Sequence, residues 1–280
     1  MPQKSVFDSL VLARAMPAAI PAFDAFDAHS AEGILMAFEE ASCPGLIAVY
    51  DKTMDEANVD ALVAYIRRRA SALRVSISII LDHGRDLRQC RQAIELGFDA
   101  VMFDGSGMSI EENLRQTAEI VNLAKRSGVF VEAELGHVGD AAHYPDDLTG
   151  LTDPESAVRF VEETGVDMLA VAIGTAHGVY RNKPTLRVDL LRRIAEAVTL
   201  PLVLHGGTGL SEAQFKSVIT SGIAKVNVST DLYVSAESAI RSACKAGGPS
   251  YLELGAIARD TIKARCAHYL SVFNTREIAQ

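Results

Sequence analysis

The 280-residue chain lacks any run of about 18 apolar residues, and its N-terminus lacks a short apolar core followed by a cleavage site. A membrane-spanning helix needs about 20 consecutive apolar residues, and a secretory signal needs an apolar core of about 7–15 residues. We therefore expect a soluble, cytoplasmic protein that has no membrane partner.

Cysteine is scarce and widely spaced. The thiols form no Cys-x-x-Cys pair and no other metal-ligand spacing, which is typical of reduced cysteines in a cytoplasmic protein. We assign no function to any of the four, which are Cys43, Cys90, Cys244 and Cys266.

Positive charge is also in short supply, with 27 Lys and Arg against 36 Asp and Glu and a net charge of −9. The one basic cluster, residues 67–69, lies in a helical pattern and indicates a solvated face. This balance argues against a nucleic-acid partner. Low-complexity tracts and Pro/Gly/Ser linkers are missing as well, so we expect residues 1–280 to form a single domain with one large core.

The chain does contain a regular alternation of short apolar runs with segments whose apolar residues recur at helical spacing. Apolar strands that alternate with single helices predict a parallel sheet covered by helices. Eight such units predict an α/β fold, the (β/α)₈ TIM barrel of about 250 residues, with an extra N-terminal helix and extra C-terminal helices. An open doubly wound sheet is the alternative, but no Gly-x-Gly-x-x-Gly follows the first run. The eight runs lie at residues 18–23, 45–50, 75–83, 99–105, 129–136, 168–174, 201–207 and 225–230.

Histidines interrupt or follow three of these runs. His83, His177 and His205 come at the ends of the third, sixth and seventh runs, each close to a glycine. Because the carboxyl ends of barrel strands meet at one mouth, we expect the three imidazoles to converge. One such histidine would more often be a hydrogen-bonded core residue, but three at equivalent positions suit a catalytic zinc ion with an open position for substrate. Carboxylates at neighbouring strand ends are Asp82, Asp104, Glu132 and Glu134.

Asp82 and His83 are adjacent, so a regular strand would point their side chains to opposite sides. Gly84, the next residue, would permit a turn that brings both to the same mouth.

Two polar segments follow the last two runs. The glycine-rich HGGTG (205–209) and the VNVST (226–230) occupy the loops that commonly bind phosphate in barrels of this type. Backbone N–H groups and a helix N-terminus would receive the anion there. The sequence therefore predicts a metal beside a phosphate, with an acid next to the metal.

The order of these motifs resembles that of the class II, metal-dependent fructose/tagatose-bisphosphate aldolases. The resemblance is clearest over residues 78–232, through LDHG, FDGS, EENL, VEAELG, AIGTAHGVY, PLVLHGGTG and KVNVST. It implies a zinc enzyme, a carbon–carbon lyase of the (β/α)₈ fold, that reversibly cleaves a ketose phosphate or bisphosphate to dihydroxyacetone phosphate and an aldehyde. It also implies a homodimer or homotetramer.

Carried over motif by motif, the resemblance makes His83, His177 and His205 the zinc ligands and Asp82 the acid/base. Asp82 could instead only orient a zinc-bound histidine. Asp104 and Glu134 would lie near the metal, Glu134 as an alternative ligand, and a monovalent cation such as Na⁺ or K⁺ would assist the phosphate. The residues around the sugar phosphate would be Gly178, Gly206, Gly207, Thr208, Asn227, Val228, Ser229 and Thr230.

The chain departs from the family in the loop after VEAELG. Related aldolases carry a glutamate there that exchanges the donor's proton, whereas this loop reads GHVGDAAHYPDDLTG and has no glutamate. His143 is the favoured substitute, because imidazole titrates near neutral pH. Asp140, Asp146 and Asp147 are the alternatives.

Other departures affect the substrate. Asp24 replaces an asparagine, and Tyr50 lies where relatives have serine or threonine. The arginine that relatives offer to a second phosphate is absent from GGPSYL, with Arg85 or Arg259 as possible substitutes. Fructose or tagatose bisphosphate and a different ketose phosphate therefore remain equal alternatives.

A non-enzymatic function is the remaining alternative. A barrel that had lost its chemistry could bind phosphate or stabilise a partner aldolase, and the altered loop favours this view. The intact Asp82 and the three histidines oppose it, because a scaffold gains nothing from a buried polar cluster.

Overall fold

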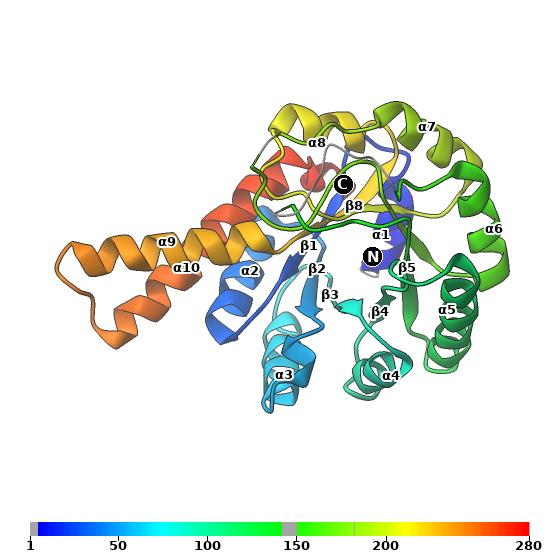
Figure 1. The fold of residues 1–280 in the computed structure, drawn as a ribbon. Coiled ribbons are helices and arrows are strands. Elements are labelled where there is room, and N and C mark those ends of the chain that lie inside the picture. Colours follow the sequence, from blue (N-terminus) through cyan, green and yellow to red (C-terminus); the bar gives the residue numbers. More distant parts are fainter. Residues whose placement is uncertain (1–4, 142–149, 182, 280) are drawn as a thin grey trace.

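The computed structural model describes residues 5–141, 150–181 and 183–279. Its centre is a closed barrel in which eight parallel strands follow one another in chain order (Figure 1). The predicted barrel is therefore confirmed. The strands are β1 (Ile20–Asp24), β2 (Gly45–Tyr50), β3 (Ile77–Gly84), β4 (Ala100–Phe103), β5 (Phe130–Leu135), β6 (Met168–Val171), β7 (Leu202–Leu204) and β8 (Ile223–Val228).

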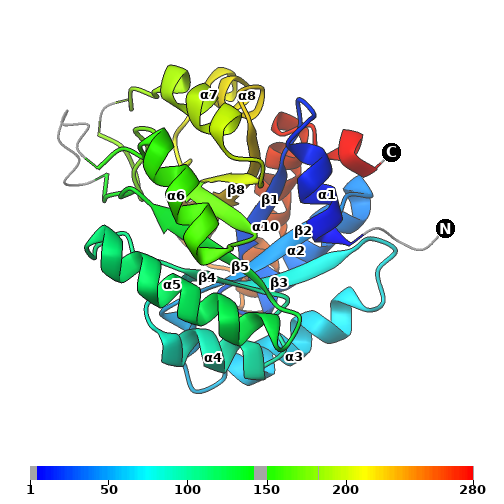
Figure 2. The ribbon, with the colours of Figure 1, turned by 90° about the vertical axis from the view of Figure 1, so that its right-hand side faces the viewer.

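Helices surround the barrel, and Figure 2 shows α3 to α8 ranged around its outside. The predicted extra N-terminal helix is α1, and in place of the predicted extra C-terminal helices the described residues hold α10 and the short 3₁₀ turn η2. Together α9 and α10 form a hairpin that projects from the barrel (Figure 1). The helices are α1 (Val6–Ala13), α2 (Ala28–Ala41), α3 (Val59–Ala70), α4 (Leu87–Glu95), α5 (Ile110–Lys125), α6 (Pro154–Thr164), α7 (Val188–Ala197), α8 (Glu212–Ile219), α9 (Thr230–Lys245) and α10 (Tyr251–Val272), with 3₁₀ turns η1 (Thr53–Asp55) and η2 (Thr275–Ala279).

The predicted runs that became β6 and β7 extend three residues beyond the observed strands. Ala172 and Ile173 continue the apolar pattern after β6 and are fully or almost fully buried, but they lie outside the sheet. Beyond them the backbone enters the left-handed region at Gly174 (φ 100°), and after β7 it does so at Gly206 (φ 70°). Apolar character alone does not separate a strand from the buried loop that follows it.

Alternate strand residues point into the barrel, which is how the site acquires its position. The lower interior is filled by apolar side chains such as Ala22, Ile80 and Met168. Towards the carboxyl ends of the strands the buried residues become polar, namely Asp24, Asp82, Glu132, Glu134, His205, Lys225 and Asn227.

Among the described residues, every helix is too short or too polar to cross a lipid bilayer.

Candidate active site

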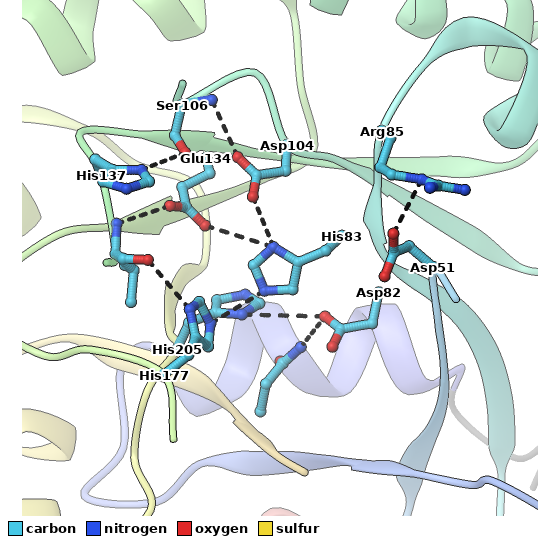
Figure 3. Close-up of polar contacts among 12 residues, drawn as sticks. Asp51, Asp82, His83, Arg85, Asp104, Ser106, Glu134, His137, His177 and His205 are labelled. Atoms are coloured by element: carbon cyan, nitrogen blue, oxygen red, sulfur yellow. Dashed lines mark hydrogen bonds and ion pairs between the residues drawn. The ribbon is translucent and has the colours of Figure 1, made fainter. Parts of the chain in front are cut away.

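Three histidines converge at the mouth of the barrel, as the sequence predicts (Figure 3). The ring centroid of His83 lies 4.7 Å from those of both His177 and His205, and the latter two are 5.9 Å apart. Each ring offers a nitrogen within 4.8 Å of the others. The side chains come from β3 and from the loops that follow β6 and β7, so three separate strand ends build one cluster.

The backbone at His83 explains how Asp82 and His83 reach the same mouth. His83 itself has a φ of 53°, in the left-handed region, and the register of β3 with β4 shifts between Leu81 and Gly84. The predicted turn therefore exists, but its positive φ belongs to His83 rather than to Gly84. Gly84 is needed for a different reason, because a Cβ atom there would lie 2.6 Å from the carbonyl oxygen of Met102 on β4.

Two carboxylates hold His83. Its Nδ1 lies 2.8 Å from Asp104 Oδ2 and 4.0 Å from Glu134 Oε2 (Figure 3). Burial opposes a charge on His83, but Asp82, Asp104 and Glu134 outweigh it and raise its pKa to about 10. Burial, with the charge of Asp104, raises the pKa of Glu134 to about 8. The site thus favours a positive charge at the His83 ring.

The other two histidines are neutral and oriented. His177 Nδ1 lies 3.1 Å from the Val138 carbonyl oxygen, which accepts its proton, so Nε2 presents a lone pair 3.1 Å from His83 Nε2. His205 Nε2 donates to Glu132 Oε1 at 3.0 Å, which leaves Nδ1 as the free acceptor. Burial lowers the pKa of both rings, that of His177 to about 3. Neutral imidazoles fixed by a second hydrogen bond are the form that binds a metal.

A buried ion pair lies beneath His205. Lys225 Nζ contacts Glu132 Oε2 at 2.6 Å, and both side chains have no exposed surface. Burial favours a neutral Glu132, but Lys225 and His205 outweigh it and lower its pKa to about 2. Sequence reasoning noted Glu132 only as a strand-end acid and missed Lys225. The available signal was a lysine within a run that the sequence predicts to be a buried strand.

Replacing Lys225 by methionine is expected to destabilise the protein by about 3–5 kcal/mol, because it leaves the Glu132 carboxylate buried without its counter-charge. Urea denaturation measures the change. The double variant Glu132→Gln/Lys225→Met removes both charges and is expected to recover most of the lost stability. If the double variant is no more stable than Lys225→Met, the cost does not come from the unpaired charge.

Asp82 is buried at the carboxyl end of β3, with one oxygen fixed. Asn227 Nδ2 donates to Asp82 Oδ1 at 2.7 Å. On β1, Asp24 is also buried, and neither of its carboxyl oxygens has a partner of good hydrogen-bond geometry among the described residues, although the Ser229 side chain lies close enough to favour its charge slightly. Burial, followed by the charge of Asp82, raises the pKa of Asp24 well above its usual range. Asp24 therefore costs free energy when it ionises.

Replacing Asp24 by asparagine is expected to stabilise the metal-free protein by about 1–3 kcal/mol at neutral pH. The folded-state pKa of Asp24 is raised, so its unfavourable contribution is absent below about pH 4 and grows as the pH rises towards the folded-state value. Urea unfolding at pH 5 and pH 8 should show a larger gain at pH 8. The surface variant Glu196→Gln serves as control, and an equal gain at both pH values would contradict the assignment.

The predicted phosphate residues do not all lie on the cleft. Gly178, Ser229 and Thr230 line a cleft of about 660 Å³ that also exposes Asp82 and His83. Ser229 and Thr230 begin α9, whose N-terminal dipole favours an anion there. Gly206 does not line the cleft, and it packs against the loop after β6, where a Cβ atom would meet the Ala176 carbonyl oxygen at 2.5 Å. Gly207, Thr208, Asn227 and Val228 are not among the cleft-lining residues, and the side chain of Val228 packs outwards into the core between strands and helices.

The loop after β5 reaches the cleft through described residues other than His143, which lies outside the described part of the chain. His137 lines the cleft, and its Nδ1 is 3.0 Å from Ser106 Oγ. Asp140 also lines it and forms an isolated parallel bridge with His177. The structure therefore brings Asp140 to the site and adds His137, which the sequence left without a role.

Of the three residues that the sequence suggests for contact with the substrate, two line the cleft and one does not. Tyr50 and Arg85 both line the cleft, and the Tyr50 ring is 6.4 Å from that of His83. Arg259 lies on α10, pairs with Asp260 and is not among the cleft-lining residues. Of the two arginines, only Arg85 is placed to meet a substrate.

Comparison with known proteins gives one family. Residues 5–277 match the family model described as fructose-bisphosphate aldolase class-II. The chain is 36% identical over 259 residues to the uncharacterized protein YdjI of Escherichia coli (strain K12), covering 92% of each. The crystal structure of the YdjI aldolase from that organism superposes with a TM-score of 0.88 at 31% identity, covering 99% of this chain and all of that one.

Two relatives have named activities. The sulfofructosephosphate aldolase of Alkalicoccus urumqiensis is 38% identical over 221 residues, covering 77% of this chain and 76% of that protein. The 6-phospho-5-dehydro-2-deoxy-D-gluconate aldolase of Halalkalibacterium halodurans is 35% identical over 244 residues, covering 85% and 84%.

Proposed function

The chain belongs to the class II fructose-bisphosphate aldolase family, and from this we propose that it is a zinc-dependent aldolase that reversibly cleaves a ketose phosphate to dihydroxyacetone phosphate and an aldehyde. The observation that carries the proposal is the cluster of His83, His177 and His205 beside the buried carboxylate of Asp82. The named relatives act on different compounds, so family membership alone does not fix the ketose.

The donor set fits a divalent metal. His177 and His205 present neutral nitrogens, and the surrounding carboxylates favour a positive charge at His83. Three imidazoles with an open position are the ligands of a catalytic zinc ion, and His83, His177 and His205 would hold it. Glu134, whose Oε2 is buried without a hydrogen-bond partner among the described residues, would serve as an alternative ligand. When bound, zinc supplies a Lewis acid for the ketone oxygen of the donor.

Asp82 would move the proton. In the cleavage direction its carboxylate takes the proton of the C4 hydroxyl, the C3–C4 bond breaks, and its electron pair passes to the donor half. In synthesis Asp82 returns that proton to the aldehyde oxygen. The hydrogen bond from Asn227 fixes Asp82 Oδ1, so this network holds the carboxylate in one orientation at the cleft.

Ser229, Thr230 and Gly178 would hold the donor phosphate. All three line the cleft, and the N-terminus of the 16-residue helix α9, at Ser229 and Thr230, attracts an anion. Fixing the phosphate would place the reacting carbons beside Asp82, which converts binding energy into orientation.

Zinc analysis and an enzyme assay together test the proposal. Purified protein is expected to contain bound zinc and to release dihydroxyacetone phosphate from at least one member of a panel of ketose phosphates with one or two phosphates. A metal-free protein that cleaves none of them would instead support the non-catalytic barrel subunit.

Four further expectations remain predictions. They are homodimer or homotetramer formation, a cytoplasmic location, help from a monovalent cation, and proton exchange by His143. Analytical ultracentrifugation would measure the number of subunits, and cell fractionation would locate the protein. Assays with and without K⁺ would test the monovalent cation. The His143→Ala variant would test proton exchange.

A further inference from the structure

The cleft also has a charged part, separate from Gly178, Ser229 and Thr230, the residues proposed to hold the donor phosphate. It is formed by Tyr50 at the end of β2, by Asp51 and Lys52 that follow it, and by Arg85 after β3. Tyr50 pairs in register with Asp82, and Arg85 follows His83 by two residues. An aldehyde whose oxygen meets Asp82 would therefore extend its remaining carbons along this part of the cleft, which we call the acceptor wall.

Arg85 on the acceptor wall is already engaged by two carboxylates. Its Nε lies 3.0 Å from Asp51 Oδ2 (Figure 3), and its Nη2 contacts Asp55 Oδ2. The Asp51 side chain is only 7% exposed, so its charge is poorly screened by solvent. A guanidinium held between two carboxylates has little net attraction left for a further anion.

The side chain of Gln89 connects the backbone at Asp51 to the backbone at Arg85. This fully buried side chain donates from Nε2 to the Asp51 carbonyl oxygen at 2.7 Å and accepts from the Arg85 backbone N–H at 3.1 Å. One amide thus ties the two segments of the acceptor wall together. The backbone segments that carry Arg85 and Asp51 are therefore held at a fixed separation, which keeps the two side chains within reach of each other.

The balance of charges among the cleft-lining residues also disfavours a second phosphate. Among its described lining residues the only lysine and arginine are Lys52 and Arg85, against the four carboxylates of Asp51, Asp82, Asp104 and Asp140. A divalent metal and one donor phosphate would leave no surplus of positive charge for a second phosphate. Phosphate recognition normally relies on an arginine free to bind in a bidentate manner.

We propose that the aldehyde product of the reaction is an uncharged, hydroxyl-bearing aldehyde without a phosphate, and that Asp51 and Asp55 enforce this choice by neutralising Arg85. The inference rests on the proposed aldolase function and names its substrate class. Hydroxyl oxygens can share the N–H groups of Arg85 without displacing its carboxylates, whereas a phosphate would meet the charge of Asp51 at close range.

Condensation of dihydroxyacetone phosphate with D-glyceraldehyde or with D-glyceraldehyde 3-phosphate tests the proposal on the zinc-loaded protein. The wild type is expected to favour the unphosphorylated aldehyde in kcat/KM by about tenfold or more. Asp51→Asn and Asp55→Asn are each expected to reduce this preference about tenfold, chiefly by lowering KM for the phosphorylated aldehyde. Asp55 is 46% exposed, so its variant should fold even where Asp51→Asn does not.

Glu56→Gln is the matched control, an exposed acid on the same segment that does not line the cleft, and it should leave the preference unchanged. A wild type that prefers the phosphorylated aldehyde, or a preference that Asp55→Asn and Asp51→Asn leave untouched, would overturn the proposal while leaving the aldolase function intact. Failure of condensation with both aldehydes, together with no cleavage of any ketose phosphate, would reject the aldolase function itself.

Discussion

Replacement of Asp82 by asparagine is expected to lower kcat about 1,000-fold with the ketose phosphate that the wild type cleaves best. Asparagine keeps the size of the side chain but cannot take the C4 hydroxyl proton. Asn227 donates to Asp82 Oδ1 at 2.7 Å, and the amide oxygen of asparagine can still accept this hydrogen bond, so the side chain should keep its place at the cleft. Steady-state kinetics with zinc analysis of the same samples measures the effect.

The alternative role of Asp82 gives a different result. A residue that only orients a metal-bound histidine should, when replaced, weaken zinc binding and leave kcat nearly normal at saturating zinc. Asp82 Oδ1 is 4.0 Å from His205 Nδ1, close enough for such an effect to be measurable. Full zinc content with lost turnover would identify Asp82 as the acid/base, and near-normal turnover would exclude that role. Asn227→Ala, which frees Asp82 Oδ1, should lower kcat to a smaller extent.

Removal of the metal is the second change with a very large expected effect. Dialysis against a chelator is expected to lower activity more than 100-fold, because the ketone oxygen of the substrate then loses the proposed Lewis acid. Added zinc is expected to restore the activity. His83→Ala should lose both zinc and activity, since it removes the proposed ligand at the centre of the cluster. His268→Ala, an exposed histidine on α10, is the control and should retain both.

Activity that survives complete chelation would contradict the metal-dependent mechanism. Recovery should also depend on pH. Burial opposes a charge on His83, but the neighbouring carboxylates outweigh it and raise the pKa of the metal-free ring to about 10, so a proton competes with the metal for this ring. Apparent zinc affinity is therefore expected to rise between pH 6 and pH 8, as measured by competition with a chromophoric chelator.

The fold was predictable because its signal is local and repeated. The run at residues 45–50 coincides with β2 residue for residue, and each alternation of strand and helix adds independent support for the barrel. The errors lie where a strand gives way to a buried loop, as at Ala172 and Ile173. There the side chains remain buried while the backbone leaves the sheet. A run of apolar residues indicates that side chains are buried, but it does not indicate whether their backbone pairs with a neighbouring strand.

The site was predictable only in part. The carboxyl ends of the strands are fixed by the fold, so His83, His177 and His205 could be brought together from sequence alone. The ion pair of Glu132 and Lys225 joins residues 93 positions apart, and no local sequence pattern predicts such a contact. The engagement of Arg85 by Asp51 and Asp55 is equally a tertiary contact, 30 residues from Asp55 and invisible to spacing rules.

The left-handed backbone at His83 sets a limit on how far this protein could be stabilised. A non-glycine residue in that conformation costs about 1 kcal/mol or more, and glycine would relieve the strain. Yet glycine would remove the imidazole that we propose as a metal ligand at the centre of the cluster. Stability and chemistry therefore compete at this one position, and we expect selection for heat resistance to find its gains elsewhere in the barrel.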